Sequence, residues 1–219
     1  MAQPIVAIST VENGNMYIPS DVANNDVLNN RTQWLESLGM ELNDTTRLAI
    51  SYTQPDFCRY QIVNEHQKGD SVLADALVTS TPGHALFLPV ADCVATVFYD
   101  EEHSVLMLAH LGRHSLEQQG GVKSVEFLTK HFATEPASLK VWLSPAPSKK
   151  AYPIYALENK GMKEALYEQL LRSGIAMKNI NDNSAETDVD PMYYSHSAFL
   201  RGDKPNDGRF AMVAMIPAK

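Results

Sequence analysis

The chain has 219 residues, of which 44% are hydrophobic and 20% are charged, a composition typical of a globular protein with a substantial core. The formal net charge is -8 and there is no basic stripe, so nucleic acid is excluded as an expected partner. No stretch approaches the roughly 20 apolar residues of a membrane span, which excludes a membrane partner.

The N-terminus and the cysteines indicate the expected location. The first ten residues lack a basic region, and their apolar run is too short for a signal peptide. Two cysteines, Cys58 and Cys93, do not form a disulfide framework and fit a reducing compartment, although one bridge stays open. We therefore expect a cytoplasmic protein. Nothing in the sequence indicates its oligomeric state.

The predicted elements begin with a helix from about Asn25 to Leu38, because apolar residues recur there at helical spacing and Gly39 suits the position after a helix. Short β-rich runs separated by turn residues follow. They are Leu48 to Thr53, Cys58 to Val63, Asp75 to Thr79 and Ala85 to Val90.

The centre of the chain predicts a β-hairpin, because the polar run Asp100 to His103 joins two β-rich apolar runs. A loop symmetric about Glu101 and Glu102 places Cys93 opposite His110. Directly opposed side chains share a face, with Cβ atoms roughly 4.5–5.5 Å apart. A thiolate and an imidazole at that distance make half of a tetrahedral zinc site, or a nucleophile and its base.

Both faces of this hairpin are apolar, so the sheet needs a layer on each side. One face carries Val94, Phe98, Met107 and Ala109, and the other carries Ala95, Val97, Leu106 and Leu108.

The remaining elements are a helix after Gly121, a strand from Lys140 to Leu143, a helix from Asn159 to Arg172, a polar loop from Asn179 to Pro191, and a closing strand from Arg209 to Ile216. We predict one domain over residues 1–219. Its fold class is α/β (α+β), a layered sandwich in which helices flank a mixed β-sheet.

The central block resembles the YfiH or laccase-domain family, also called multicopper polyphenol oxidase family proteins. The matching segments are Asp75-Ala-Leu-Val-Thr for the family's "DALVT", Ala91-Asp92-Cys93 for "ADC", and His110-Leu-Gly112 within "HAGWRG". Outside the block, Asn30-Arg31 is similar to a helical "NR", Asp207-Gly208-Arg209 to "TGR", and Tyr194-Ser195-His196 more loosely to "FSxR".

The resemblance implies that Cys93, His110 and an upstream His of a "QxHG" motif bind one metal, usually zinc, with copper as the alternative. The upstream residue matched here is His66. Three such ligands leave an open position, which suits catalysis. Asp92 either orients a ligand or is a turn residue at a strand end. The implied activity is phosphorolysis of purine nucleosides, with possible adenosine deaminase activity, so a purine nucleoside and phosphate are the expected small-molecule partners.

Phosphorolysis requires a group that holds phosphate, and the planar fork of an arginine suits phosphate oxygens. Arg31 is the first candidate, with Asn30 beside it and with Arg113, His114 and Arg209 as further candidates.

The sequence also departs from the family pattern. The Trp-Arg pair after "HAG" is replaced by Arg113-His114, and the following Gly by Ser115. The "GPSI" segment lacks its Gly in the run 144–147, and the upstream motif at His66 lacks its Gln. These changes fall in the loops that would face substrate.

Three other functions stay open. A copper-dependent phenol oxidase needs several histidine-rich ligand clusters, which seven scattered histidines do not supply. A metal-free cysteine hydrolase, including one that edits cell-wall precursors, would use Cys93 as nucleophile and His110 as base. A non-enzymatic metal-binding protein would keep the ligands without turnover.

Overall fold

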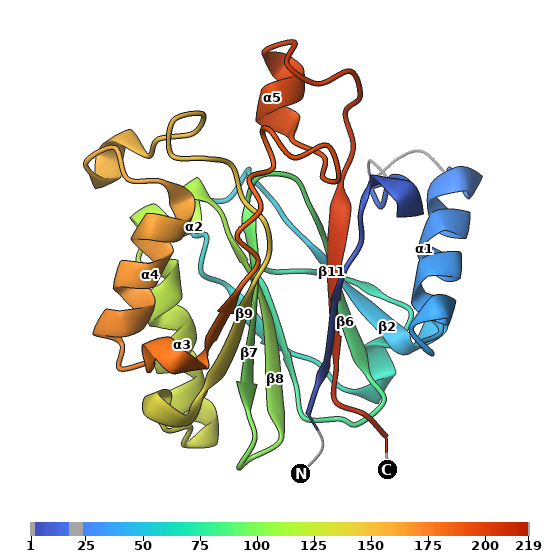
Figure 1. Cartoon of the computed structure of the whole chain (residues 1–219). Helices are drawn as coiled ribbons and strands as arrows, with labels where there is room; N and C mark the ends of the chain where they lie inside the picture. Colours follow the sequence, from blue (N-terminus) through green and yellow to red (C-terminus); the bar gives the residue numbers. More distant parts are fainter. Residues whose placement is uncertain (1–2, 18–23, 219) are drawn as a thin grey trace.

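The chain forms two mixed β-sheets that pack face to face, with helices on both outer surfaces (Figure 1). The computed structural model describes residues 3–17 and 24–218. The five-stranded sheet has the order β1-β11-β6-β2-β4, and the six-stranded sheet has the order β10-β9-β7-β8-β5-β3. Both sheets mix parallel and antiparallel neighbours, as expected for the predicted fold class.

The strands of the five-stranded sheet are β1 (Ile5–Ile8), β11 (Phe210–Met215), β6 (Ala85–Val90), β2 (Thr45–Ala49) and β4 (Ser71–Leu73). Those of the six-stranded sheet are β10 (Ile180–Asp182), β9 (Lys140–Leu143), β7 (Val94–Asp100), β8 (Val105–Leu111), β5 (Ala76–Thr79) and β3 (Tyr60–Ile62).

The α-helices are α1 (Asn25–Ser37), α2 (Arg113–Glu117), α3 (Gly120–Phe132), α4 (Met162–Arg172) and α5 (His196–Leu200). Short 3-10 turns are η1 (Val11–Asn13), η2 (Leu42–Asp44), η3 (Glu65–Gln67), η4 (Pro136–Ser138), η5 (Tyr155–Leu157) and η6 (Met177–Asn179). None of the described helices has the length and apolarity needed to cross a bilayer.

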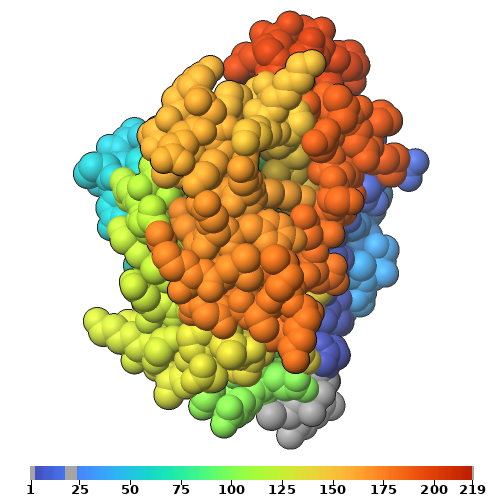
Figure 2. All heavy atoms as spheres, turned by 60° about the vertical axis from the view of Figure 1, so that its left-hand side comes forward, coloured from blue at the N-terminus to red at the C-terminus, as the bar shows by residue number. Residues whose placement is uncertain are grey.

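Three apolar clusters separate the layers. The central one lies between the two sheets and contains Leu88, Val97 and Leu108, all of which are buried. A second cluster lies between the six-stranded sheet and the helices α2, α3 and α4, and Figure 2 shows this helical face, with α4 in front. The third lies between the five-stranded sheet and α1, and includes Trp34 and Phe87. The result is a four-layer sandwich, helix–sheet–sheet–helix.

This arrangement confirms the layered prediction and corrects one part of it. The two faces of the β7–β8 hairpin divide between clusters as predicted, with Val94 and Phe98 toward the helices and Ala95 and Val97 toward the other sheet. However, the layer on that second face is a sheet and not a helix. Apolar alternation shows that a face is buried, but it does not specify what covers it.

The hairpin register also differs from the prediction. Ala95 lies opposite His110, and Asp100 pairs with Val105, so the loop is centred between Glu102 and His103. The register is therefore shifted by two residues. Since successive side chains alternate between faces, an even shift leaves Cys93 on the same face as His110, toward the inter-sheet layer.

Helix α1 is confirmed within one residue of its predicted end. The Asn24 side chain accepts hydrogen bonds from the backbone N–H groups of Asp26 and Val27, which caps the helix. Gly39 follows the helix in the left-handed region, with φ of 72°.

Two other predictions were wrong in position. Strand β2 begins at Thr45, earlier than the predicted Leu48, and ends at Ala49. At its start the hydroxyls of Thr45 and Thr46 donate to the backbone carbonyls of Leu42 and Gln67. The predicted strand residues beyond it form a loop. Conversely, the predicted loop from residue 179 contains β10, which pairs with β9 in parallel.

Candidate functional site

A cavity of about 920 Å³ opens at the end of the sandwich where α5 lies. The ends of β2 and β6, the start of β7 and the end of β8 meet there. Its lining includes Cys93, His110 and Asp92 together with aromatic and cationic side chains. A concave surface that combines apolar side chains with a few converging polar groups is typical of small-molecule sites.

Cys93 and His110 lie together in this cavity, although they are not directly opposed. A Cβ added at Gly112 would lie 2.6 Å from Cys93 Sγ and 3.2 Å from His110 Cε1, so the sulfur and the ring flank one point. The His110 backbone N–H donates to Asp75 O at 2.9 Å, and its ring meets the ring of Tyr52 edge-on, with centroids 6.4 Å apart.

Burial favours the neutral forms of both groups. It raises the pKa of the Cys93 thiol to about 12, and the carboxylate of Asp92 acts in the same direction. It lowers the pKa of His110 to about 4, against the opposing effect of Asp75. Near neutral pH the pair is therefore a thiol and a neutral imidazole, and proton transfer from sulfur to the ring is unfavourable. This weakens the cysteine hydrolase alternative, which needs a thiolate.

The pair requires a glycine at position 112. We expect Gly112→Ala to force Cys93 Sγ and His110 apart, because a Cβ at 2.6 Å from sulfur is sterically excluded. The expected result is a loss of roughly ten- to hundred-fold in any activity that uses the pair, since small misplacements of reacting groups have such effects. Turnover by this variant is compared with that of Gly39→Ala, at the exposed turn after α1, where an added Cβ has no atom within 4 Å. Equal activity of the two variants would contradict the geometry.

Asp92 is a buried anchor. Its Oδ1 accepts from Ser195 Oγ at 2.6 Å and Thr187 Oγ1 at 3.1 Å, and its Oδ2 accepts from the Ser197 backbone N–H at 2.7 Å. The backbone at Asp92 has φ of 76°, which non-glycine residues rarely adopt. The carboxylate thus ties α5 to the residue next to Cys93, and no hydrogen bond joins it to Cys93 or His110.

His66 lies elsewhere. It is exposed in η3, its backbone N–H donates to Asn64 Oδ1, and it is not part of the cavity lining. Among the residues that the structure describes, no group of three His, Cys, Asp or Glu side chains could hold a metal ion. Cys93 and His110 therefore offer two of the three donors that the resemblance implies, and the predicted three-ligand set does not form.

A different segment, the loop after β2, borders the cavity. This loop, and not the segment around His66, reaches the cavity through Tyr52 and Phe57. It reads Gln54-Pro55-Asp56-Phe57 and offers no histidine. Asp56 is exposed and accepts from the Cys58 backbone N–H.

Asn30 and Arg31 are also outside the cavity lining. Arg31 is 5% exposed, donates from Nε and Nη2 to Met16 O at 2.9 and 2.6 Å, and lies over the ring of Phe87. Asn30 donates to Asn15 O. Both side chains fasten the segment after η1 to α1, and neither contacts the cavity.

The other predicted cations do line it. Arg113 and His114 begin α2 directly after Gly112, and Arg113 Nη2 lies 3.2 Å from His114 Nε2. The His114 ring stacks on Phe57 at 4.7 Å. Arg209 lies over the ring of Tyr17 and donates to Asp207 Oδ1 at 2.8 Å.

Several lining residues were not predicted from the sequence, including Arg47, Tyr52, Phe57 and Tyr152. They come from β2, from the loop that was predicted as strand, and from the segment before α4. None of the sequence motifs marks any of them.

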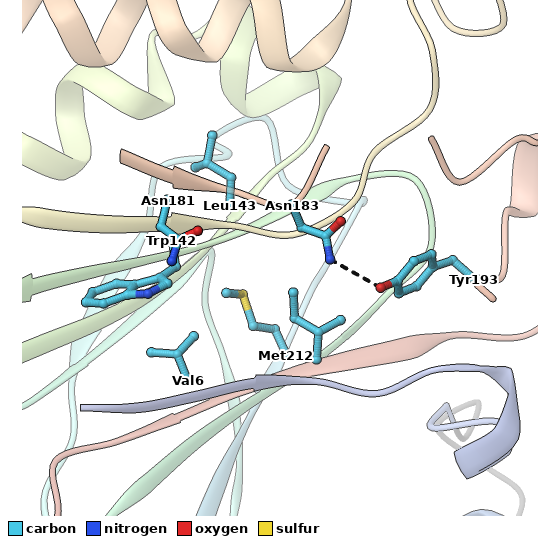
Figure 3. A pocket seen from close by; sticks show the side chains of 8 residues that line it. Val6, Trp142, Leu143, Asn181, Asn183, Tyr193 and Met212 are labelled. Carbon is cyan, nitrogen blue, oxygen red and sulfur yellow. Dashed lines mark hydrogen bonds between the residues drawn. The ribbon is translucent and has the colours of Figure 1, made fainter. Parts of the chain in front are cut away.

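A second cavity, of about 400 Å³, opens between the edges of the two sheets (Figure 3). Its lining has no ionisable group apart from the Tyr193 hydroxyl, which accepts from Asn183 Nδ2 at 3.2 Å. Trp142 and Asn181 lie on the same side of it. None of the predicted site residues lies there.

The fold and the site define the class of this protein, which is an α/β sandwich. Its two mixed sheets lie between helical layers, and a thiol and an imidazole lie at one end of the inter-sheet layer. Residues 7–166 match the model of the family described as multi-copper polyphenol oxidoreductase laccase. The chain belongs to this family.

Relatives and solved structures agree with this assignment. The chain is 27% identical over 176 residues to a Mycobacterium tuberculosis protein named purine nucleoside phosphorylase, covering 72% of this chain and 68% of that protein. A Xylella fastidiosa protein of the same name is 29% identical over 167 residues, which are 65% of this chain and 61% of that protein. A Bacteroides thetaiotaomicron protein of the same name is 26% identical over 113 residues. That match covers 52% of this chain and only 39% of the Bacteroides protein.

The fold is that of the hypothetical protein YfiH from Bacillus licheniformis, with a TM-score of 0.85 at 20% identity over 97% of this chain and 92% of that one. YlmD from Geobacillus stearothermophilus gives a TM-score of 0.84 at 20% identity over 98% and 92%.

Proposed function

We propose that this protein cleaves purine nucleosides by phosphorolysis, with Cys93 and His110 at the reacting end of the cavity. The single observation that carries the proposal is the convergence of this pair beneath an aromatic and cationic lining. The name of the relatives, purine nucleoside phosphorylase, supports the same reaction class.

The lining supplies the groups that such a reaction needs. Tyr52, Phe57 and Tyr152 offer flat apolar surfaces on which a purine can stack. Arg113, at the start of α2, offers a guanidinium to phosphate oxygens. Phosphate attacks the anomeric carbon of the sugar, the bond to the base breaks, and the departing base takes up charge. The thiol of Cys93 and the neutral ring of His110 can donate hydrogen bonds to that base.

Zinc, or copper, remains a prediction of the family resemblance. A zinc ion would act as a Lewis acid at the pair. Cys93 and His110 provide only two of the three protein donors that such a site needs, so the described residues do not fit it. Deaminase activity likewise remains a prediction, since it would need a metal-bound hydroxide. The donor clusters of a multicopper oxidase are not formed among the described residues.

The experiment is an assay of purine base release from inosine and adenosine, with and without phosphate, by the purified protein. Phosphate-dependent release of hypoxanthine or adenine is expected. Release that is equal without phosphate would favour a hydrolase, and no release from either nucleoside would remove the proposed function.

We expect His66→Ala to leave both metal content and purine release unchanged, because His66 is exposed and outside the cavity. Elemental analysis and the same assay check this expectation. His110→Ala is the matched histidine variant and should lose activity. A fall in bound metal with His66→Ala would show that the segment at η3 does reach the pair.

A further inference from the structure

Arg47 places a cationic group at one wall of the cavity, on the far side of the five-stranded sheet from Cys93 and His110. Its register partner on β6 is Phe87, which packs against α1. Paired residues of neighbouring strands share a face, so the Arg47 side chain leaves the sheet on the α1 side. Cys93 and His110 face the inter-sheet layer. The cavity joins both regions around the ends of β2 and β6.

A second guanidinium lies next to it. Arg31 stacks over the same Phe87 ring, 5.4 Å from its centroid, and the charge of Arg47 contributes to the lowered pKa of Arg31. Burial also lowers the pKa of Arg47. The two cations are therefore close together and partly desolvated.

Neither cation has an acidic partner within residues 3–17 and 24–218. Within these residues, the Arg31 side chain donates hydrogen bonds only to Met16 O. The Arg47 side chain makes no hydrogen bond or ion pair with any of the described residues. Arg209, by contrast, pairs with Asp207. Desolvated charges are costly unless they are paired, so two adjacent guanidiniums with no carboxylate partner in the described part of the chain favour a bound anion.

Tyr17 completes this region, which we call the Arg47 arm and define as Arg47, Tyr17 and Arg209. Tyr17 interacts electrostatically with Arg47, and Arg209 lies 5.2 Å above its ring. The arm thus offers the guanidinium of Arg47, a phenol, and a second guanidinium on Arg209 that is shared with Asp207, a set that suits phosphate oxygens.

The position of the arm bears on the source of the anion. Arg47 leaves β2 on the α1 side, whereas Cys93 and His110 face the inter-sheet layer, so the arm and the pair lie at two parts of one cavity wall. A phosphate in the arm and a base beside the pair match the two ends of one extended ligand.

We propose that the Arg47 arm binds the phosphate of an organic phosphate ligand, of the nucleoside monophosphate class, whose base lies beside Tyr52 and His110. The nucleoside part of this inference rests on the proposed function, and the phosphate part does not.

Isothermal titration of the whole chain with adenosine 5′-monophosphate, adenosine and inorganic phosphate, at low salt, tests the inference. The wild-type protein should bind the monophosphate at least about ten-fold more tightly than adenosine. Arg47→Gln should remove this difference and leave adenosine binding unchanged. Arg47→Lys, which keeps a charge without the fork, should retain part of it. Arg172→Gln, at an exposed arginine of α4, should behave as wild type.

The outcomes separate this inference from the proposed function. Equal affinity for adenosine and its monophosphate, or an advantage that persists in Arg47→Gln, overturns the inference. If inorganic phosphate binds through Arg47 but adenosine 5′-monophosphate binds no more tightly than adenosine, the anion is not part of an organic ligand and the inference is overturned. A preference for the monophosphate that depends on Arg47, in a protein that releases no base from nucleosides, supports the inference while the proposed function fails.

Discussion

Cys93→Ala should reduce purine release by about 10²- to 10⁴-fold, the range expected when a group that assists proton transfer or charge stabilisation is removed from a reacting centre. The thiol lies beside His110 at the inner end of the cavity, and its removal leaves the ring without its neighbour. The measurement is kcat and KM for inosine at saturating phosphate.

Cys58→Ala is the matched control, because Cys58 is the other free cysteine and does not line the cavity. It should keep wild-type turnover. Thermal melts of both variants establish that they are folded. If Cys93→Ala turned over inosine at the wild-type rate, the pair would have no part in the reaction and the proposed centre would be lost.

Asp92→Ala should destabilise the protein by about 3 kcal/mol, because it removes a buried carboxylate that accepts three hydrogen bonds and leaves their donors unsatisfied. For a chain of this size the melting temperature should fall by about 10 °C. Because α5 supplies His196 and Leu200 to the cavity wall, KM should rise more than kcat falls. Denaturant unfolding and steady-state kinetics measure the two effects.

Two further variants separate the contributions at Asp92. Asp92→Gly loses the same hydrogen bonds but accepts the positive φ, so it should be about 1 kcal/mol more stable than Asp92→Ala. Asp92→Asn keeps the shape and one acceptor, so its stability should lie between alanine and wild type. An alanine variant as stable as wild type would show that α5 is held by other contacts.

Local patterns in the sequence predicted most elements near the site. Short apolar runs identified β6 and β9 with their observed ends, and the residues of the hairpin were divided correctly between its two faces. The side-chain period of two also explains why an error of two residues in the register still left Cys93 and His110 on one face.

The ligand set could not be predicted in this way. His66 was matched to the upstream histidine of the "QxHG" motif, but the chain turns at η3 and leaves it exposed. The loop at residues 50–57, which was predicted partly as strand, reaches the cavity instead. Arg31 was expected to hold phosphate, yet it is buried against Phe87 and Met16.

The sequence by itself determined the layered α/β class, the buried hairpin and the shared face of Cys93 and His110, because each depends on a local period that residue order expresses directly. Only the tertiary structure decided that a second sheet covers the hairpin, that Asp92 holds α5, and that Arg47 and not Arg31 lines the cavity. These features depend on contacts between segments far apart in the chain, and the conformation of each loop is set by what it packs against.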